Sequence, residues 1–162
     1  MVPSTMDATK VDTVALPVIT LPHALPTLPA YATSGSAGAD VLAAVENAVT
    51  LAPMQRALIP TGLILLIPQG YEVQIRARSG LAIKHGITLI NAIGTIDSDY
   101  RHELKVALVN LGDQPYTIER GDRIAQLVVA PVVQASFTVA ELTPAQAQAE
   151  FERQGGFGST GR

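Results

Sequence analysis

The sequence contains no cysteine, which excludes disulfide bonds, a thiolate nucleophile and a zinc site built on cysteine. Charge is scarce as well, since Asp, Glu, Lys and Arg make up 15% of the 162 residues and the formal net charge is −3. A nucleic-acid polymer requires a basic face that neutralises its phosphates. We therefore expect no nucleic-acid polymer as partner, whereas a small phosphorylated ligand needs only a few local cations.

Long apolar runs are missing too. Runs such as Leu63–Ile67 are far too short to span a bilayer, and Met1–Asp12 is polar and lacks the apolar region of a secretory signal. We therefore expect a cytoplasmic protein with no membrane partner. Because hydrophobic residues make up 48% of the chain, we also expect other subunits to cover part of its apolar surface.

Long helices are disfavoured because prolines recur at positions 17, 22, 26, 29, 53, 60, 68, 115, 131 and 144. Short strand-like runs lie between them. Tyr71–Arg78 and Glu103–Val109 alternate apolar and polar residues, as half-buried strands do. Tyr116–Glu119 is the expected hairpin partner of the second run, and Arg123–Val133 reads as a strand buried on both sides or at a subunit interface.

One short helix is predicted over Ser79–His85, with Ser79 as its N-cap and Gly86 ending it. Many short strands separated by turn signals then predict an all-β sandwich or jelly roll. We divide the chain into a flexible N-terminus (1–13), a β jelly-roll catalytic domain (14–140) and a C-terminal part (141–162). Within this last part, Glu141–Gln154 is polar and reads as a tether.

The tether leads to Gly155–Gly161, which contains four glycines, two hydroxyl residues and Phe157. The amides of a glycine-rich segment, together with hydroxyl groups, form a concavity that suits phosphate oxygens. The ring of Phe157 offers a face on which a base could stack. The alternative is an ordinary disordered tail.

Four further segments combine residues suited to phosphate chemistry: Ala37–Val41, Arg78–Ala82, Asn91–Glu103 and Gly121–Gln126. The second places a cation and a hydroxyl at a strand-to-helix junction, where free amides favour anions. The third holds Asp97, Asp99 and Tyr100, which could supply a base or a ligand to metal-bound water, and a stacking ring. Each segment also has a purely structural explanation. In chain order these are an ordinary turn, a helix cap, a hairpin tip and a buried structural hydrogen bond of Gln126.

These five segments, read in order as AGAD, RSGLA, GTIDSDYR, GDRIAQ and GGFGSTG, resemble the five motifs of the trimeric deoxyuridine triphosphatase (dUTPase) family. The resemblance runs from about Val18 to Gly161. It implies a dUTPase-like β-clip, a distorted jelly roll, that forms a homotrimer. Each active site of such a trimer takes pieces from all three chains, and the C-terminal arm reaches over a neighbour.

The family hydrolyses dUTP to dUMP and pyrophosphate with Mg²⁺, through attack of water at the α-phosphorus. The resemblance implies that the carboxylate of Asp97 orients and deprotonates this water. It also implies that Asn91 recognises uracil and that Tyr100 leaves no room for a 2′-hydroxyl. Asp40 would contact the metal indirectly, through water. The substrate-binding positions implied are Arg78, Ser79, Gly80, Asn91, Gly94, Thr95, Ile96, Tyr100, Lys105, Gln126, Arg153, Phe157, Gly158, Ser159 and Thr160.

The sequence departs from the family pattern at four places, of which Val41 in place of a common Leu is harmless. His102 stands where glycine is usual, and Ala77 where proline is usual. Before the paired glycines, Glu152–Gln154 replaces the usual Arg-Gly-x. Either one residue is deleted and Arg153 keeps its contact with the γ-phosphate, or that contact is lost.

Two other functions would require residues different from those in this sequence. A dCTP deaminase shares the fold and the nucleotide site, but it needs a catalytic glutamate that is not visible beside Arg78 and Ser79. A non-catalytic nucleotide-binding or regulatory trimer would lack the catalytic acid or the arm, whereas Asp97 and Phe157 are both present.

Overall fold

The computed structural model describes residues 12–149. They divide between two compact units, whose boundary lies between Val132 and Val133. The first unit holds twelve strands and one helix: β1 (Val18–Thr20), β2 (Ala30–Tyr31), β3 (Ala39–Leu42), β4 (Val49–Leu51), β5 (Arg56–Pro60), β6 (Leu63–Leu65), β7 (Tyr71–Arg76), α1 (Ser79–His85), β8 (Ile87–Leu89), β9 (Ile93–Ile96), β10 (Lys105–Asn110), β11 (Tyr116–Ile118) and β12 (Arg123–Pro131).

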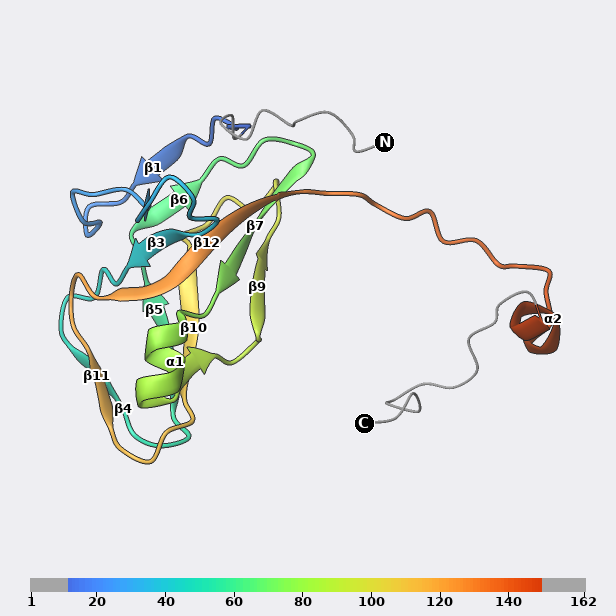
Figure 1. Cartoon of the computed structure of the whole chain (residues 1–162). Coiled ribbons are helices and arrows are strands. Elements are labelled where there is room, and N and C mark those ends of the chain that lie inside the picture. Colours follow the sequence, from blue (N-terminus) through green and yellow to red (C-terminus); the bar gives the residue numbers. More distant parts are fainter. Residues whose placement is uncertain (1–11, 150–162) are drawn as a thin grey trace, which may run out of the picture. The chain divides into compact units, whose positions relative to one another are not determined.

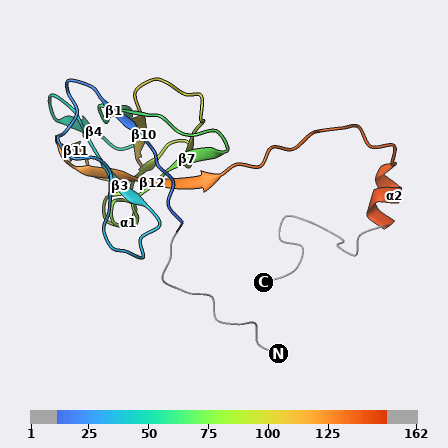
Figure 2. The same ribbon diagram turned by 90° about the horizontal axis from the view of Figure 1, so that it is seen from above.

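The strands form small antiparallel sheets (Figures 1 and 2). The largest has five strands in the order β2-β3-β12-β7-β9, and a three-stranded sheet has the order β5-β10-β8. Two further pairs, β1-β6 and β11-β4, complete the set among the described residues. The strands follow the period-two pattern of the sequence, which confirms the all-β prediction.

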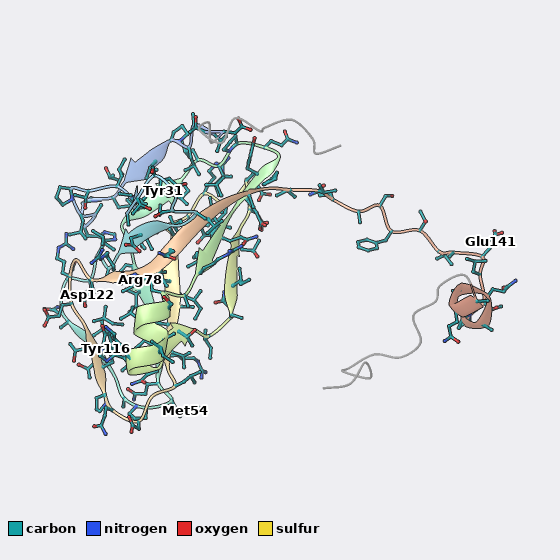
Figure 3. All side chains as sticks on the ribbon, viewed as in Figure 1. Tyr31, Met54, Arg78, Tyr116, Asp122 and Glu141 are labelled. Atoms are coloured by element: carbon teal, nitrogen blue, oxygen red, sulfur yellow. The ribbon has the colours of Figure 1, made fainter. Side chains whose placement is uncertain are left out.

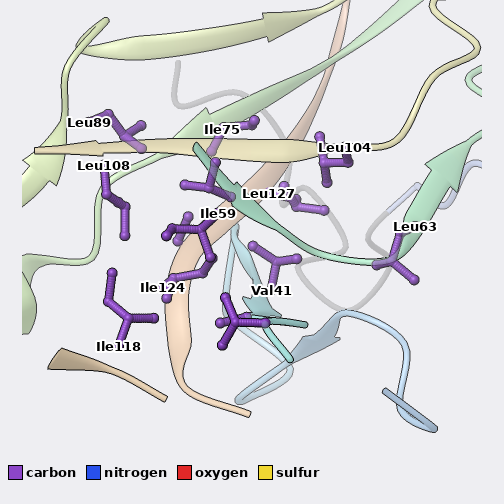
Figure 4. Packing of buried hydrophobic residues seen from close by; sticks show 14 of the residues in the cluster. Val41, Ile59, Leu63, Ile75, Leu89, Leu104, Leu108, Ile118, Ile124 and Leu127 are labelled. Atoms are coloured by element: carbon purple, nitrogen blue, oxygen red, sulfur yellow. The ribbon is translucent and has the colours of Figure 1, made fainter. Parts of the chain in front are cut away.

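The core lies between these sheets, and nearly every strand contributes to it (Figure 4). In β7, for example, Val73 and Ile75 are buried whereas the alternate residue Arg76 is exposed. Val106 and Leu108 of β10 are also fully buried. Burial of one face of each strand fixes the register, because a slip of one residue would turn the apolar side chains toward solvent.

The predicted hairpin between Glu103–Val109 and Tyr116–Glu119 is wrong. β11 pairs with β4, with Thr117 opposite Thr50, while the two edges of β10 are taken by β5 and β8. Asn110 at the end of β10 is fully buried; its Nδ2 donates to the carbonyl oxygens of Leu51 and Gln114, each at 2.8 Å. These bonds direct the chain away from β10 before β11 begins.

Helix α1 has the predicted bounds, but its N-cap is Arg78 rather than Ser79, and no side chain caps it by a hydrogen bond. Gly86 ends the helix as predicted, in the left-handed conformation with φ of 69°. A Cβ at Gly86 would lie 2.2 Å from the backbone nitrogen of Gly112, so both the turn and the close packing require glycine here.

The second unit contains a helix that the sequence reading missed. Helix α2 (Pro144–Ala149) lies within the predicted tether, so residues 12–149 contain two short helices where the sequence predicted one. Thr143 and Gln146 cap it reciprocally: the Thr143 amide donates to Gln146 Oε1 at 2.9 Å, and the Gln146 amide donates to Thr143 Oγ1 at 3.3 Å. Neither described helix has the length and apolar character needed to cross a membrane.

Candidate active site

Asp40 stands at the centre of a polar cluster on the five-stranded sheet. The register places it directly opposite Gln126 of β12, and Gln126 in turn lies opposite Arg76 of β7. Directly opposed residues project from the same face of a sheet. Gln126 Nε2 accordingly lies 3.4 Å from Asp40 Oδ1, so the amide has a partner within a strand that is apolar from Leu127 to Pro131.

Two arginines complete the cluster. Arg78 lies where β7 gives way to α1 (Figure 3), and its Nε is 3.2 Å from Asp40 Oδ1. Arg123 Nη1 is 3.5 Å from Asp40 Oδ2, and Arg78 Nη1 donates to the Arg123 carbonyl oxygen at 2.9 Å. The Asp40 side chain is only 13% exposed. One carboxylate between two guanidinium groups leaves an excess positive charge, which suits an anionic ligand.

The close packing of Gln126 against Gly38 explains why a glycine stands two residues before Asp40. A Cβ on Gly38 would lie 3.0 Å from Cβ of Gln126 and 3.2 Å from its Oε1. A larger residue would crowd the Gln126 side chain, which would have to shift by a few tenths of an ångström. The sequence AGAD is therefore tied to the packing of Gln126.

The first turn of α1 adds free backbone donors beside Arg78. The first amides of a helix have no partner within the helix, and this turn contains no acidic residue. Ser79 and Gly80 are both exposed, and a Cβ on Gly80 would meet nothing within 4 Å. The first turn therefore offers free amides and the exposed Ser79 beside Arg78, whose guanidinium is partly buried by its contacts with Asp40 and the Arg123 carbonyl. This arrangement favours phosphate oxygens.

The third predicted segment forms a separate part of the site. Asn91 and Ala92 make the turn between β8 and β9, with Ala92 at φ of 62° and the Ile93 amide donating to the Asn91 carbonyl at 2.7 Å. Asp97 follows β9 directly and is exposed. The Tyr100 amide donates to the Asp97 carbonyl at 3.2 Å, so acid and ring share one turn.

The strand between these two ends carries three further predicted site residues. Gly94 is buried against Ile75, whose Cβ would lie 3.1 Å from an added Cβ. Thr95 is exposed and lies opposite Gln74 of β7, and Ile96 is half-buried. Glycine at position 94 thus lets β9 lie close on the core.

A single chain does not bring Asp97 to the Asp40 cluster. The register of β7 and β9 sets Ile93 opposite Arg76 and Ile96 opposite Val73, so Asp97 lies toward the end of β7 that is farthest from Arg78. With about 3.3 Å per residue along a strand, the backbones at Asp97 and Arg78 are roughly 15–20 Å apart.

Lys105 begins β10, and its Nζ lies 3.6 Å from Oε2 of Glu103. Burial by itself would raise the pKa of Glu103, but hydrogen bonds from His23 and the Gly62 amide, with the charges of His23 and Lys105, hold that pKa below its usual value. Sequence reasoning did not single out Glu103, His23 or Arg123. Arg123 and Glu103 stand inside the segments it quoted, whereas nothing near His23 marks it.

Five predicted positions lie outside the described residues: Arg153, Phe157, Gly158, Ser159 and Thr160. Within residues 12–149, no group of three or more His, Cys, Asp or Glu side chains is placed to hold a metal ion. Asp40 Oδ1 lies 3.2 Å from Nε of Arg78, the residue directly before α1.

Comparison with known proteins identifies the family. The dUTPase family model matches residues 26–161. The chain belongs to the dUTPase family. It is 57% identical over 136 residues to the deoxyuridine 5′-triphosphate nucleotidohydrolase of Wolbachia sp. subsp. Brugia malayi (strain TRS), covering 83% of this chain and 85% of that protein. It is 61% identical over 136 residues to the enzyme of that name from Roseobacter denitrificans, covering 83% and 86%.

Solved structures show the same fold. A mutant dUTPase of Staphylococcus bacteriophage 80alpha in complex with dUpNHpp matches with a TM-score of 0.77 and 27% identity, covering 93% of this chain and all (100%) of that one. A mutant dUTPase from phage phi11 of S. aureus, whose structure is described as revealing the coordination of a structural Mg(II) ion, matches with a TM-score of 0.71 and 25% identity, covering 81% and 99%. The β-clip or jelly-roll prediction is thereby confirmed.

Proposed function

We propose that this dUTPase-family chain hydrolyses dUTP to dUMP and pyrophosphate, which keeps uracil out of DNA and supplies dUMP for thymidylate synthesis. The observation that carries the proposal is the gathering of Asp40, Arg78 and Gln126 from three of the five sequence motifs into one cluster. Relatives above 50% identity bear the name of this activity.

The phosphate chain is assigned to the start of α1. Arg78 supplies a guanidinium whose orientation is set by Asp40 and by the Arg123 carbonyl, and Ser79 and Gly80 supply a hydroxyl and backbone amides. Gln126 supports Asp40 from the neighbouring strand. Phosphoryl transfer requires mainly positioning and stabilisation of charge, and these groups provide both.

The nucleoside is assigned to the third segment. Asn91, at the turn between β8 and β9, would hydrogen-bond uracil, with the backbone of Gly94–Ile96 forming the wall that excludes the thymine methyl. Tyr100 would lie under the deoxyribose. Asp97 would take the proton of a water whose oxygen attacks the α-phosphorus, while the bond to the bridging oxygen breaks and pyrophosphate leaves. Lys105 would add a cation near this end.

Magnesium fits the donors that the chain offers. Mg²⁺ keeps several waters and is usually bound by one or two carboxylates plus substrate phosphates, so it needs no cluster of three protein ligands. Asp40 would hold it through water and remain paired with Arg78. When bound, the ion supplies positive charge against the phosphate oxygens.

We further propose that the working enzyme is a homotrimer located in the cytoplasm, with the 14–140 jelly roll as its catalytic domain. The distance between Asp97 and Arg78 within one chain supports sites in which these residues come from different subunits. The 141–162 part would close over such a site, with Phe157 stacking on uracil and with Arg153, Gly158, Ser159 and Thr160 at the γ-phosphate.

Release of pyrophosphate with Mg²⁺ present, measured for dUTP, dCTP, TTP and UTP, tests the activity. Of the four nucleotides, we expect only dUTP to be hydrolysed at a high rate. Release of ammonia from dCTP would identify a deaminase instead. Binding of dUTP with no turnover would identify a non-catalytic nucleotide-binding protein.

A further inference from the structure

A second polar cluster surrounds Glu103, whose Oε2 also lies 3.6 Å from Nζ of Lys105. His23 Nε2 lies 2.7 Å from Glu103 Oε1, and the Gly62 amide donates to the same oxygen at 2.9 Å. The side chains of Glu103 and His23 are 14% and 31% exposed. One carboxylate thus joins two segments that are distant in sequence, at the edge of the core.

The segment that carries His23 is itself held firmly. Arg120 Nη2 donates to the carbonyl oxygens of His23, at 2.8 Å, and Ala24, at 3.2 Å. The Leu21 amide donates to the Gly62 carbonyl at 2.7 Å. Gly62 has φ of 71°, and a Cβ there would lie 2.4 Å from Cα of Ala24. This close packing makes the His23 turn a fixed support.

Glu103 connects this support to the loop that carries Asp97 and Tyr100. Tyr100 Oη donates to the Glu103 carbonyl at 3.1 Å. The Leu104 amide donates to the Leu63 carbonyl at 2.7 Å, and Thr61 Oγ1 donates to the Leu104 carbonyl at 2.6 Å. The loop therefore has one end in β9 and the other fastened at Glu103, with the Tyr100 hydroxyl bonded to the fastened end.

We propose that the His23–Glu103 pair is a positioning element that fixes the 97–103 loop and thereby sets the placement of the Tyr100 ring. The inference rests on the proposed dUTP hydrolysis, because Tyr100 is assigned there to discrimination between deoxyribose and ribose. Neither His23 nor Glu103 touches the substrate in this proposal. Small displacements of a positioned group are costly to catalysis, since a shift of about 1 Å can cost about 100-fold in rate.

The test compares Glu103→Ala, His23→Ala and the double variant with the wild-type full-length chain. We expect each single variant to lower kcat/KM for dUTP about tenfold and to raise the UTP/dUTP ratio of kcat/KM about threefold or more. The double variant should lose little more than either single one, because partners in one interaction are not additive. Glu103→Gln keeps an acceptor for His23 and Gly62 and should retain most of the discrimination.

The matched control is Glu46→Gln. Glu46 is an exposed carboxylate that lines the same open hollow as His23 and Arg120, so its replacement removes a nearby charge without touching the pair. Rate and ratio should stay at wild-type values. An unchanged UTP/dUTP ratio in trimeric Glu103→Ala and His23→Ala, or full additivity in the double variant, would overturn the proposal.

Amide hydrogen exchange of the ligand-free protein gives a second readout that does not depend on activity. The 97–103 amides should exchange about tenfold faster in the Ala variants than in the wild type. Should the Ala variants fail to fold, His23→Phe, which keeps a ring but cannot hydrogen-bond to Glu103, carries the same measurement. If the wild-type protein does not turn over dUTP, the proposed function is wrong, but the positioning role is still tested by exchange. If the amide exchange rates of residues 97–103 are the same in the variants and the wild type, the positioning role is wrong.

Discussion

The Nε atom of Arg78 lies 3.2 Å from Oδ1 of Asp40, although Arg78 is the N-cap of α1 and Asp40 lies in β3. The contact forms because β3 and β7 both flank β12 in the five-stranded sheet. Asp97, by contrast, lies toward the far end of β7. A site that needs all three residues would therefore take Asp97 from one subunit and the Asp40–Arg78 pair from another.

Replacing Asp97 by Asn should lower kcat for dUTP about 10²–10⁴-fold while dUTP binding survives, because the amide keeps the shape but cannot accept the water's proton. Steady-state kinetics and calorimetric binding measure the two effects. Asp99→Asn is the matched control and should remain active. Wild-type turnover in Asp97→Asn together with an inactive Asp99→Asn would reassign the base to Asp99.

Replacing Tyr100 by Ala should raise turnover of UTP relative to dUTP, since removal of the ring opens space for a 2′-hydroxyl. Tyr100→Phe keeps the ring and loses only the hydrogen bond to the Glu103 carbonyl, so it should change the ratio less. The measurement is kcat/KM for both nucleotides. If the ratio is the same in wild type and Tyr100→Ala, the ring serves packing only.

A chain ending at Gln154 should fold and assemble normally but lose most of its activity, because the C-terminal arm is missing. Full-length Asp97→Asn should also lose most of its activity, because the base is missing. Co-refolding the two at equal amounts should restore activity at roughly a quarter of sites, as expected for a closed three-fold assembly whose acid and arm come from different chains. The parents mixed without refolding are the control. If mass analysis confirms mixed trimers and these are still inactive, then Asp97 and the C-terminal arm of each site come from the same chain.

Replacing Asn110 by Ala should lower the free energy of unfolding by about 2–4 kcal/mol, because buried groups left unsatisfied cost about 1–3 kcal/mol each. Asn110 donates to the Leu51 and Gln114 carbonyls and accepts from the Gly112 amide at 2.8 Å. Urea unfolding measures the change. Asn47→Ala, at an exposed position, should stay within about 0.5 kcal/mol of wild type, and an equal loss in both would refute the role of Asn110.

The stability that Glu103 contributes should depend on pH. Its pKa in the folded protein lies below the usual 4.5, so the folded state favours the carboxylate. The contribution is therefore complete above about pH 4.5 and is lost as the pH falls through the lower, folded-state pKa. Unfolding of wild type and Glu103→Gln, compared from pH 7 to pH 3, should show a difference that shrinks in acid; a constant difference would contradict the prediction.

Local sequence was sufficient for much of the fold. The alternation in Tyr71–Arg78 predicted β7, and the run ending at Gly86 predicted α1, because period and glycine conformation depend only on neighbouring residues. The order of the five motifs was enough to predict the family. It also marked Asp40, Arg78 and Gln126, the three residues that the sheet brings together.

Tertiary structure alone decided the rest. Tyr116–Ile118 has the pattern of a strand, but its partner depends on which edges are free, and β5 and β8 already occupy both edges of β10. His23 carries no local signal, and its role arises only because Gly62 and Glu103 meet it across the fold. Periodicity along the chain specifies which face of a strand is buried, whereas the choice of partners is a property of the whole packed chain.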